Sequence, residues 1–465
     1  MKLVYGVKDR PKWGQLIVFA LQQLLAILAA TIAVPTIIGH GMSQSAALFG
    51  AGVGTIVYLL FTKFKSPVFL GSSFAFLGSM FAAFAGGVSA SLGYLGLLIG
   101  AVFAGLVYVI IAVIVKFAGV KWIDKIMPAV VIGPTVAIIG LSLAGNAIGD
   151  AVNASANGFN MDLNGILCLI CALVTLGTTI VSSVYGKKMM KMIPFIIGIL
   201  AGYAVAAIFT GFSYIEGAEA MRIIDFTKFK NMQWYPDFAF ITAFGGKYGD
   251  TNIGAYIGTI AVAYIPVAFV VFAEHIADHK NISSIIETDL LKDPGLTRTL
   301  LGDGVGSIAG ALFGGCPNTT YGESVGCVAI SGNASVATIF VTAILAIVFS
   351  FIAPATTFLS TIPACVMGGV CIALYGFIAV SGLKMIQGVD LNENKNLFVV
   401  SVILIAGVGG MSLTFGQVTI TEVACALILG ILTNLLVNIK SKKDTEKIEE
   451  QAETPAQSED TAEGK

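Results

Sequence analysis

Long apolar runs recur from one end of the chain to the other, and they limit its fold more than any other feature. A helix needs about 20 apolar residues to cross the roughly 30 Å hydrocarbon core of a bilayer. Runs of this kind occupy 14–38, 43–62, 91–116, 128–148, 162–184, 192–212, 254–277, 336–352, 363–380, 396–414 and 419–439. Charged residues make up only 11% of the 465 positions, which is too little to cover a soluble domain of this size.

Three further apolar segments are short or interrupted, and they lie at 66–84, 303–315 and 319–331. With these included, we predict an all-α polytopic membrane protein with fourteen transmembrane segments. An even number of crossings places both termini on the same side of the bilayer.

The basic residues are distributed unevenly between the two sides. All but four of the 26 lysines and arginines fall in loops on the side of the termini. The exceptions are Arg222, Lys228, Lys230 and Lys247, in a long polar loop at 214–253. Because cytoplasmic loops are enriched in Lys and Arg, both termini are predicted to be cytoplasmic and 214–253 external. The charged segment 440–465 lacks an apolar face, and we expect a disordered cytoplasmic tail there.

The loop at 214–253 separates two halves of seven segments each. An odd number of segments per half forces opposite orientations, which gives the 7+7 inverted repeat found in many secondary transporters. The third segment of each half is interrupted: SPVFLGSSFAFLGS contains Pro67, and CPNTTYGESVGCVAIS contains Pro317. Gly, Ser, Thr and Asn favour extended or turn backbone there. Such backbone is tolerated at membrane depth only inside protein or beside a cavity, so the paired interruptions indicate a binding site.

Acidic residues within the apolar segments are the main candidates for function, because charges are costly inside a membrane. Glu274 lies late in the eighth segment, and Asp278 follows four residues later on the same helix face. Glu323 lies in the second interrupted segment. Asp278 is nearer the cytoplasmic end, where it could instead be solvated. His275 and His279 point to other faces, and they could titrate or simply lie near the interface at the helix end.

These acids narrow the chemistry of a ligand. Two carboxylates without a buried cation argue against an anion, and they suit a cation or a neutral molecule rich in N–H groups. Backbone N–H groups at the interrupted segments would donate to carbonyl oxygens. A planar ring with alternating N–H and C=O groups would satisfy both sets. Phe74 and Tyr321, at matching points of the two segments, could sandwich such a ring or could be ordinary packing residues.

Other classes of protein fit the sequence less well. A channel or anion exchanger of the same fold would need a basic anion-binding group at the interrupted segments, and the sequence has none there. An intramembrane enzyme would need a nucleophile or metal constellation, for which Ser72 or Ser73 beside Glu274 is too little. Cys168 and Cys171 form C-x-x-C without a histidine partner, and packing explains them better. We therefore expect no enzyme activity, no metal or cofactor, and no nucleic-acid partner.

One stretch carries a family signature, and it reads Pro317-Asn318-Thr319-Thr320-Tyr321-Gly322-Glu323, followed by Gly326, Ser331 and Gly332. Supporting matches are Ala273-Glu274-His275, KDPGLTRTLLGDG, Gly71-Ser72-Ser73-Phe74-Ala75-Phe76 and Pro363…Gly368-Gly369…Leu374-Tyr375-Gly376. In these motifs the chain, from about residue 5 to 440, resembles the nucleobase–ascorbate transporter family, and within it the bacterial uracil–proton symporters. Asn-Thr-Thr-Tyr-Gly-Glu is typical of the uracil branch, whereas xanthine and urate carriers tend to have a Gln-Asn start.

The resemblance implies a core domain at 1–126 and 254–353, which holds segments 1–4 and 8–11, and a gate domain at 127–213 and 354–439. It implies that segments 3 and 10 are short antiparallel strands followed by helices. It further implies uracil import with protons across the bacterial cytoplasmic membrane, by alternating access between the two domains. Xanthine or thymine on the same scaffold is the alternative, and a homodimer through the gate domain is possible.

The resemblance also implies a set of substrate-binding residues: Phe74, Glu274, Tyr321, Gly322, Glu323 and Tyr375. Glu274 and Glu323 would hydrogen-bond a pyrimidine ring, and the backbone N–H groups of Phe74 and Gly322 would donate to it. Tyr321 would pack on the ring, and Tyr375 would approach from the gate domain.

The proton-linked position of the family is Asp278 in this chain, where some relatives have His, and Glu323 is a second candidate for the coupled proton. Three further positions depart from the family pattern. Ser324 replaces the usual Asn, Ser331 replaces the usual Thr, and Gln23 stands where many relatives carry a first-segment His. The changes to Asp and Gln bear on the proton relay more than on the substrate site.

Overall fold

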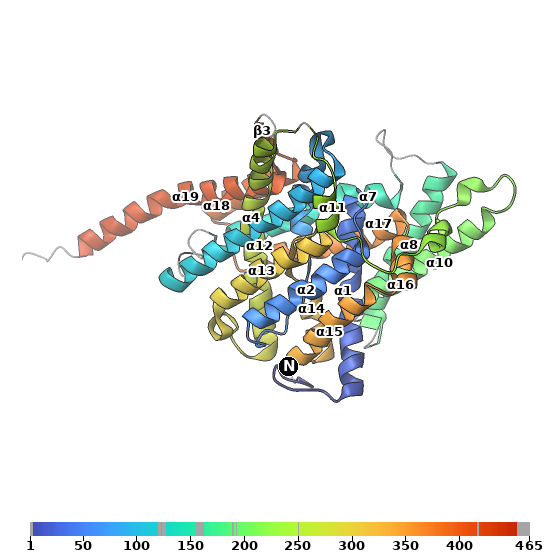
Figure 1. The fold of residues 1–465 in the computed structure, drawn as a ribbon. Helices are drawn as coiled ribbons and strands as arrows, with labels where there is room; N and C mark the ends of the chain where they lie inside the picture. The colour runs from blue at the N-terminus through green and yellow to red at the C-terminus, as the bar shows by residue number, and fades with distance from the viewer. Residues whose placement is uncertain are drawn as a thin grey trace, which may run out of the picture.

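The computed structural model describes residues 3–119, 122, 127–153, 162–187, 190–191, 193–249, 251–415 and 418–452, and it is built mainly from helices (Figure 1). Within these residues, nine helices are long and apolar enough to span a bilayer. They are α1 (Trp13–Ile38), α2 (Gln44–Phe61), α4 (Ala90–Ala118), α6 (Ala129–Ser142) continued by α7 (Ala144–Ala151), α8 (Leu163–Tyr185), α10 (Pro194–Phe212), α12 (Ile253–Ile286), α17 (Ala364–Met385) and the first part of α19 (Glu422–Ala452). The predicted class, a helical polytopic membrane protein, is confirmed.

The remaining predicted segments correspond to elements that are shorter or less apolar than these nine. The helices among them are α13 (Leu296–Gly314), α15 (Val336–Phe349), α16 (Ala353–Ser360) and α18 (Asn394–Val408). Helices α15 and α16 are bent by 83° and make a tenth span if they are counted together, so the number fourteen stays a prediction. Helix α13 begins at Leu296, and the predicted start at 303 is wrong. Arg298 and Asp303 lower the hydropathy of its first turns, which hid the helix from the apolar pattern.

The two interrupted segments meet as a pair of antiparallel strands, as predicted. Strand β1 (Leu70–Ser72) pairs with β2 (Asn318–Thr320), and Gly71 faces Thr319 in the register. The pairing extends beyond the strands, because the Tyr321 N–H donates to the Phe69 carbonyl at 3.1 Å. After β1 the chain enters η1 (Phe74–Phe76) and α3 (Leu77–Phe84), and after β2 it enters α14 (Gly322–Ser331). Two helices therefore begin at one central strand pair.

The helices pack in two groups. In the first, α2 lies against α13, α13 and α12 lie against α4, and α15 lies against α1 and α2. The α2–α13 crossing is close enough that a Cβ added to Gly50 would come within 2.3 Å of the Gly310 carbonyl oxygen. In the second, α17 packs on α6, α7 and α8, α8 packs on α10, and α18 packs on α19. The division into a core and a gate domain stays a prediction.

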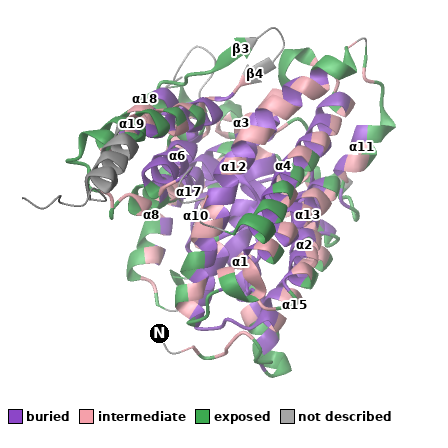
Figure 2. Ribbon diagram, turned by 90° about the vertical axis from the view of Figure 1, so that its left-hand side faces the viewer, coloured by how far each residue is buried: buried purple, intermediate pink, exposed green. Residues whose placement is uncertain are grey.

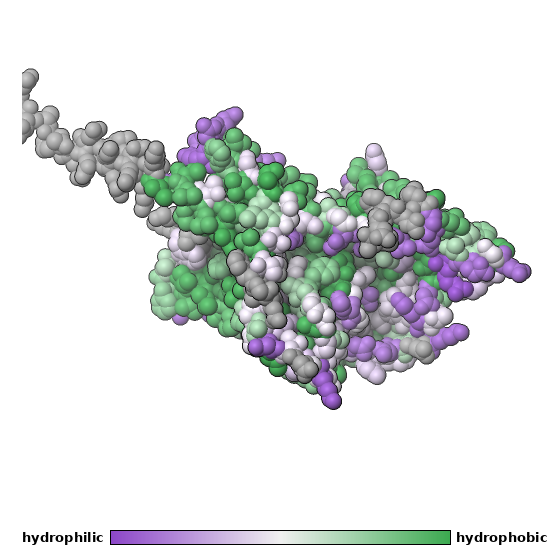
Figure 3. Space-filling model, turned by 90° about the horizontal axis from the view of Figure 1, so that it is seen from above, coloured by the Kyte–Doolittle hydropathy of each residue, from purple (hydrophilic) through white to green (hydrophobic). Residues whose placement is uncertain are grey.

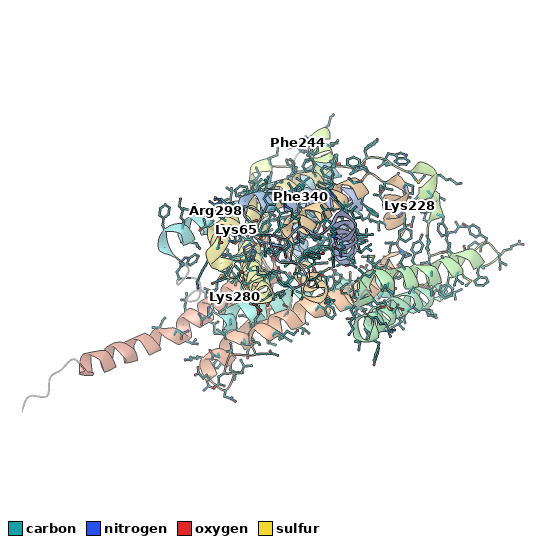
Figure 4. All side chains as sticks on the ribbon, turned by 90° about the horizontal axis from the view of Figure 1, so that it is seen from below. Lys65, Lys228, Phe244, Lys280, Arg298 and Phe340 are labelled. Carbon is teal, nitrogen blue, oxygen red and sulfur yellow. The ribbon has the colours of Figure 1, made fainter. Side chains whose placement is uncertain are left out.

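Burial follows this arrangement. Figure 2 shows buried residues along α12, α17 and α6 in the middle, while exposed residues are frequent on α18, α19 and α8. Exposed side chains are often apolar, including Leu173, Ile180 and Ile208, and Figure 3 shows hydrophobic residues over broad parts of the surface. In Figure 4 the labelled side chains Lys65 and Arg298 lie near each other and Lys228 lies apart, on the other side of the view. The described surface is that of a protein surrounded by lipid.

Three regions outside the spans complete the fold. The loop at 214–253 contains η3 (Glu219–Met221), η4 (Phe226–Asn231) and α11 (Ala239–Gly245), while η2 (Ala85–Gly87) and η5 (Leu291–Gly295) lie in other connections. A hairpin of β3 (Leu413–Phe415) and β4 (Val418–Ile420) precedes α19 and was not predicted.

Helix α19 continues to Ala452, so 440–452 is helical where the sequence predicted a disordered tail from 440. This segment is rich in Lys, Glu and Gln, which are good helix formers even without an apolar face. The rest of the predicted tail, 453–465, lies outside the described residues.

Candidate functional site

Helix α12 carries two of the predicted acids to the paired strands. Glu274 is half-buried and Asp278 is buried, and the two share a helix face because they are four residues apart. The Thr320 hydroxyl, at the end of β2, donates a hydrogen bond of 2.8 Å to Asp278 Oδ2. A Cβ added to Gly322 would lie 3.8 Å from Asp278 Oδ1. The Asp278 carboxylate therefore reaches the start of α14.

The two helix starts supply hydrogen-bond donors at this point. Tyr321 has extended backbone (φ −102°, ψ 119°), and α14 begins at the next residue, Gly322. Glu323 lies in the first turn of α14 and is half-buried. On the other side, η1 begins at Phe74 after the extended residue Ser73. N–H groups in the first turn of a helix have no partner within the helix, and the helix dipole makes that end positive.

The aromatic residues of the site are arranged differently from the predicted sandwich. The Tyr321 hydroxyl donates to the Ser72 carbonyl at 2.8 Å, and its ring lies over Gly71, where an added Cβ would be 2.4 Å away. The Phe74 ring instead meets the Tyr375 ring edge-on, with centroids 5.7 Å apart. Among the described rings, Phe74 has no contact with Tyr321. Tyr375 comes from α17, so this pair joins the two groups of helices.

A hydrogen bond links Gln23 and Ser324, two positions at which the sequence is predicted to depart from the family pattern. Gln23, on α1, donates from Nε2 to the Ser324 hydroxyl at 2.6 Å and to the Ser324 carbonyl at 3.3 Å. The Ser324 hydroxyl also accepts from the Phe69 N–H at 3.2 Å. Gln23 and Ser324 are both buried. The first turn of α14 is thereby tied to α1 and to the chain leading into β1.

Two histidines on α12 lie deep in the protein and not at the interface. His275 Nδ1 is 2.7 Å from Asp303 Oδ2 on α13, and His279 Nε2 is 2.6 Å from the Tyr58 hydroxyl on α2. The two imidazoles stack with centroids 4.0 Å apart. All four of these side chains are fully buried. The helix-end alternative for the histidines is wrong, because α12 continues to Ile286 and both side chains are buried against Asp303 of α13 and Tyr58 of α2.

Buried charge in the described part of the chain is confined to acids and histidines. The buried Asp, Glu and His residues are His275, Asp278, His279 and Asp303, and no described Lys or Arg is buried. Asp278, Glu323 and Asp303 all lie within electrostatic reach of Glu274. Within the described residues, the Glu274 carboxylate has no hydrogen-bond partner. The site is rich in acceptors and poor in cations, which suits a ligand with N–H groups and disfavours an anion.

A narrow hollow lies beside Phe74, between the two groups of helices. It is lined by Phe74, Ala75, Gly78, Ile139, Ser142, Leu143, Thr421, Glu422 and Val423. The lining comes from η1 and α3 on one side and from α6 and the start of α19 on the other. The hollow therefore lies where the first helix start faces the second group of helices.

Comparison with known proteins decides the family. Residues 14–415 match the model of a family described as the permease family. The chain belongs to this permease family. It is the nucleobase–ascorbate transporter family that the motif around Glu323 predicted. The uracil permease of Bacillus caldolyticus is 39% identical over 94% of this chain and 95% of its own length. The uracil permeases of Bacillus subtilis and Escherichia coli K12 are 37% and 36% identical, over 98% and 94% of the chain and of their own lengths.

The permease is thus a multi-pass membrane transport protein and not an enzyme. The relatives named above come from bacteria, which points to the bacterial cell membrane as its location. Its fold is shared with more distant transporters. The transmembrane domain of the cyanobacterial bicarbonate transporter BicA matches with a TM-score of 0.64 and 16% identity, over 92% of this chain and 99% of that one. SLC26A9 matches with a TM-score of 0.63 and 12% identity, over 93% and 66%. At such low identity the likeness concerns the fold alone.

Sequence reasoning missed Asp303 and the partner of His279 in this permease. Asp303 is a lone acid inside an apolar helix, which is a signal of function, but the late predicted start of α13 put it at a helix end. Tyr58 gave no signal, since a tyrosine in an apolar span is ordinary. The Phe74–Tyr375 contact could not be predicted from the sequence either, because it joins residues from two different groups of helices.

Proposed function

We propose that this permease imports uracil across the bacterial cytoplasmic membrane by proton symport. The observation that carries the proposal is the meeting of two helix starts, at Phe74 and Gly322, with two half-buried carboxylates, Glu274 and Glu323. The helix starts offer N–H donors and the carboxylates offer acceptors. Uracil presents alternating ring N–H and C=O groups, so one flat molecule satisfies both sets. The relatives named uracil permeases support this choice of base.

In this proposal each predicted site residue has a defined contact. Glu274 and Glu323 accept hydrogen bonds from the ring N–H groups, and the backbone N–H groups of Phe74 and Gly322 donate to the ring carbonyls. Tyr321 supports the site from the strand pair, where Gly71 and Ser72 hold its ring and hydroxyl in place.

Tyr375 acts from the gate side. Its edge-on contact with Phe74 closes the site when the two domains approach, and the contact opens when they rock apart. Alternating access then exposes the uracil site first to one side of the membrane and then to the other. With both termini cytoplasmic, as the loop charges predict, import runs from the side of the 214–253 loop.

The coupled proton is assigned to Asp278, with Glu323 as the second candidate. Three carboxylates within electrostatic reach of one another repel when all are ionised, and one added proton relieves this repulsion. Protonation from outside would therefore favour binding of a neutral base. Asp278 also touches the end of β2 through Thr320, so a change in its charge acts directly on the strand that leads to Gly322.

A homodimer through the gate domain completes the proposal. Helices α8 and α10 pack on each other and carry exposed apolar side chains, including Leu173 at 56% and Ile208 at 58% exposure. Either lipid or a second copy must cover such a face. Crosslinking of the purified protein in detergent would give a dimer band in this proposal and a monomer band without it.

Uptake of labelled uracil by cells that express Glu274→Gln tests the site. The side-chain amide of Gln has only one accepting oxygen, whereas the carboxylate of Glu has two. Because one hydrogen bond from the ring would then be lost, we expect uracil uptake to fall at least about 100-fold. Glu219→Gln, in the exposed 214–253 loop, is the matched control and should transport normally. Near-normal uptake by Glu274→Gln would overturn the assignment of the site.

Membrane vesicles test the proton separately. Uracil uptake driven by an inward pH gradient should stop when an ionophore collapses the gradient. Uptake that ignores the collapse would contradict proton coupling but would leave the uracil site untouched.

Two alternatives can be separated by simple assays. Competition of labelled uracil uptake by unlabelled xanthine and thymine would show whether another base is the preferred substrate. An anion exchanger of the same fold is disfavoured because no Lys or Arg of the described residues is buried at the strand pair.

A further inference from the structure

The chain before α1 runs along the end of α14 that is far from the strand pair. The Val4 and Tyr5 N–H groups both donate to the Gly332 carbonyl, at 2.8 and 3.2 Å. The Ala334 N–H in turn donates to the Tyr5 carbonyl at 2.9 Å, in a parallel bridge. Residues 3–9, which we call the N-terminal strap, are therefore paired with the connection from α14 to α15, and in Figure 1 the N-terminus lies beside the start of α15.

The pairing continues to the last residue of the strap. The Val336 N–H donates to the Val7 carbonyl at 3.1 Å, and the Ser335 hydroxyl donates to the Asp9 carbonyl at 2.6 Å. Within the strap, the Gly6 N–H donates to Asp9 Oδ2 at 2.7 Å. Hydrogen bonds therefore hold the strap to the α14–α15 connection along its whole length.

The same strap is also attached to the first turns of α1. The Tyr5 hydroxyl donates to Gln15 Oε1 at 2.7 Å, and the Tyr5 ring meets the Phe19 ring edge-on with centroids 6.0 Å apart. Leu3 and Val7 are partly buried against the core. The strap thus ties the start of α1 to the far end of α14.

The shortness of α14 makes its far end relevant to the site. The helix has only ten residues, Gly322–Ser331, and Gly332 ends it in a left-handed conformation with φ 67°. Ten helical residues span about 15 Å, so Glu323 and the strap lie at opposite ends of one short, stiff element. A displacement of the far end is therefore passed to the turn that bears Glu323.

Side-chain packing holds the far half of α14 on one side only. Cys327 is 4% exposed and contacts Ala26 of α1, and Ile193 at the start of α10 packs against them. A Cβ added to Gly326, by contrast, would meet no atom within 4 Å. Without the strap, the far end of α14 would be free to shift toward the open side.

We propose that the N-terminal strap is a positioning element of the uracil site, which holds α14 from the end opposite to Glu323. The proposal rests on the proposed function, because it assigns the uracil contacts to Gly322 and Glu323. The strap does not touch uracil and acts through α14. Displacement of binding groups by a fraction of an ångström to about 1 Å is enough to change affinity strongly.

Uracil binding by purified full-length variants tests the positioning role. Val4→Pro removes the N–H group that donates to Gly332 at 2.8 Å. Loss of this bond should raise the uracil Kd by about three- to tenfold. Val4→Ala is the matched control, because it keeps the N–H and trims a side chain that is 62% exposed, and it should bind uracil as wild type does. An unchanged Kd in Val4→Pro would overturn the positioning role.

Labelling of Cys327 with N-ethylmaleimide, followed by mass spectrometry of its peptide, reports on α14 itself. Cys327 lies one turn before Ser331, so a loosened helix end exposes its thiol. Labelling should be at least about tenfold faster in Val4→Pro than in wild type and unchanged in Val4→Ala. Unchanged labelling in Val4→Pro would show that the strap does not hold α14. Cys316, which is 1% exposed and precedes β2, is the internal control, and equal acceleration there would mean a merely structural role for the strap.

Ser335→Ala provides a second variant at the other end of the strap. It removes the 2.6 Å bond to the Asp9 carbonyl and should act in the same direction, with an uracil Kd raised about two- to threefold and faster labelling of Cys327. Tighter uracil binding or slower labelling would contradict the proposal. Failure of the wild-type protein to bind uracil would overturn the proposed function, whereas the labelling of Cys327 would still decide whether the strap holds α14.

Discussion

The two groups of helices differ in the chemistry of their buried side chains. In the described part of the predicted core, Asp278, Asp303, His275 and His279 are buried. In the described part of the predicted gate, buried polar side chains are hydroxyls, thiols and an amide, such as Thr175. Among the described residues, the buried carboxyl and imidazole groups therefore lie in one of the two groups of helices. In the alternating access proposed above, the described part of the gate would move without carrying a buried charge through hydrocarbon, which would be costly.

The largest expected effect comes from breaking the buried pair of Asp303 and His275. Asp303→Leu leaves His275 Nδ1 without its partner at 2.7 Å, and an unsatisfied buried hydrogen-bonding group costs about 1–3 kcal/mol, more when a charged group is involved. Thermal unfolding in detergent should show a clear loss of stability. Lys65→Met is the control, since the Lys65–Asp293 pair is solvent-exposed and such pairs contribute about 0–1 kcal/mol. Equal shifts for the two variants would mean that the core does not depend on its buried charges.

Added side-chain volume at the strand pair should reduce stability nearly as much as the loss of the Asp303–His275 pair. In Gly71→Ala the new methyl group would lie 2.4 Å from the Tyr321 ring, and the ring has to move. We expect a loss of about 1–3 kcal/mol in stability and about tenfold weaker uracil binding. Gly326→Ala on α14 meets no atom within 4 Å and should leave both quantities unchanged. Normal uracil binding by Gly71→Ala would show that Tyr321 does not support the site.

A comparable effect on stability is expected at Tyr58. Tyr58→Phe removes the hydroxyl that contacts His279 and Ser66 at 2.6 and 2.7 Å, and this should cost about 1–3 kcal/mol in unfolding free energy. Tyr264 is the matched control, because it is equally buried and its hydroxyl has no partner among the described residues. Tyr264→Phe should be neutral or slightly stabilising. The reverse ranking of the two variants would contradict the assigned hydrogen bonds.

Substitutions of polar groups in the predicted gate should have the smallest effects. Tyr375→Phe removes a hydroxyl without a described partner and keeps the ring against Phe74, so stability should change by less than about 0.5 kcal/mol. Uracil uptake should stay within about twofold of wild type. A large loss of uptake would mean that the gate supplies a polar contact to the base, and the division of chemistry between the two groups would then be incomplete.

The sequence predicted the parts of this structure that follow from local patterns. Apolar runs located the long helices, and Pro67 and Pro317 with their Gly, Ser and Thr neighbours located the strands, because backbone preference acts within a few residues. The motif around Glu323 also indicated the family. Side-chain pairs between distant segments were out of reach: Gln23 with Ser324, Asp303 with His275, and Phe74 with Tyr375.

Two errors of the sequence reasoning share a physical cause. The late start of α13 and the interface placement of His279 both came from treating polar residues as helix ends. In this protein, α12 and α13 keep such residues inside the helix and pair them with each other and with α2. Tertiary pairing makes a buried polar residue acceptable, and no local pattern reveals it.

Direct binding of uracil to the purified protein, compared with xanthine, tests the central claim most directly. In the proposed site the carboxylates and helix starts bind a single pyrimidine ring, so we expect saturable binding of uracil and binding of xanthine weaker by at least about tenfold. Equal or tighter binding of xanthine, or no binding of uracil, would contradict the account.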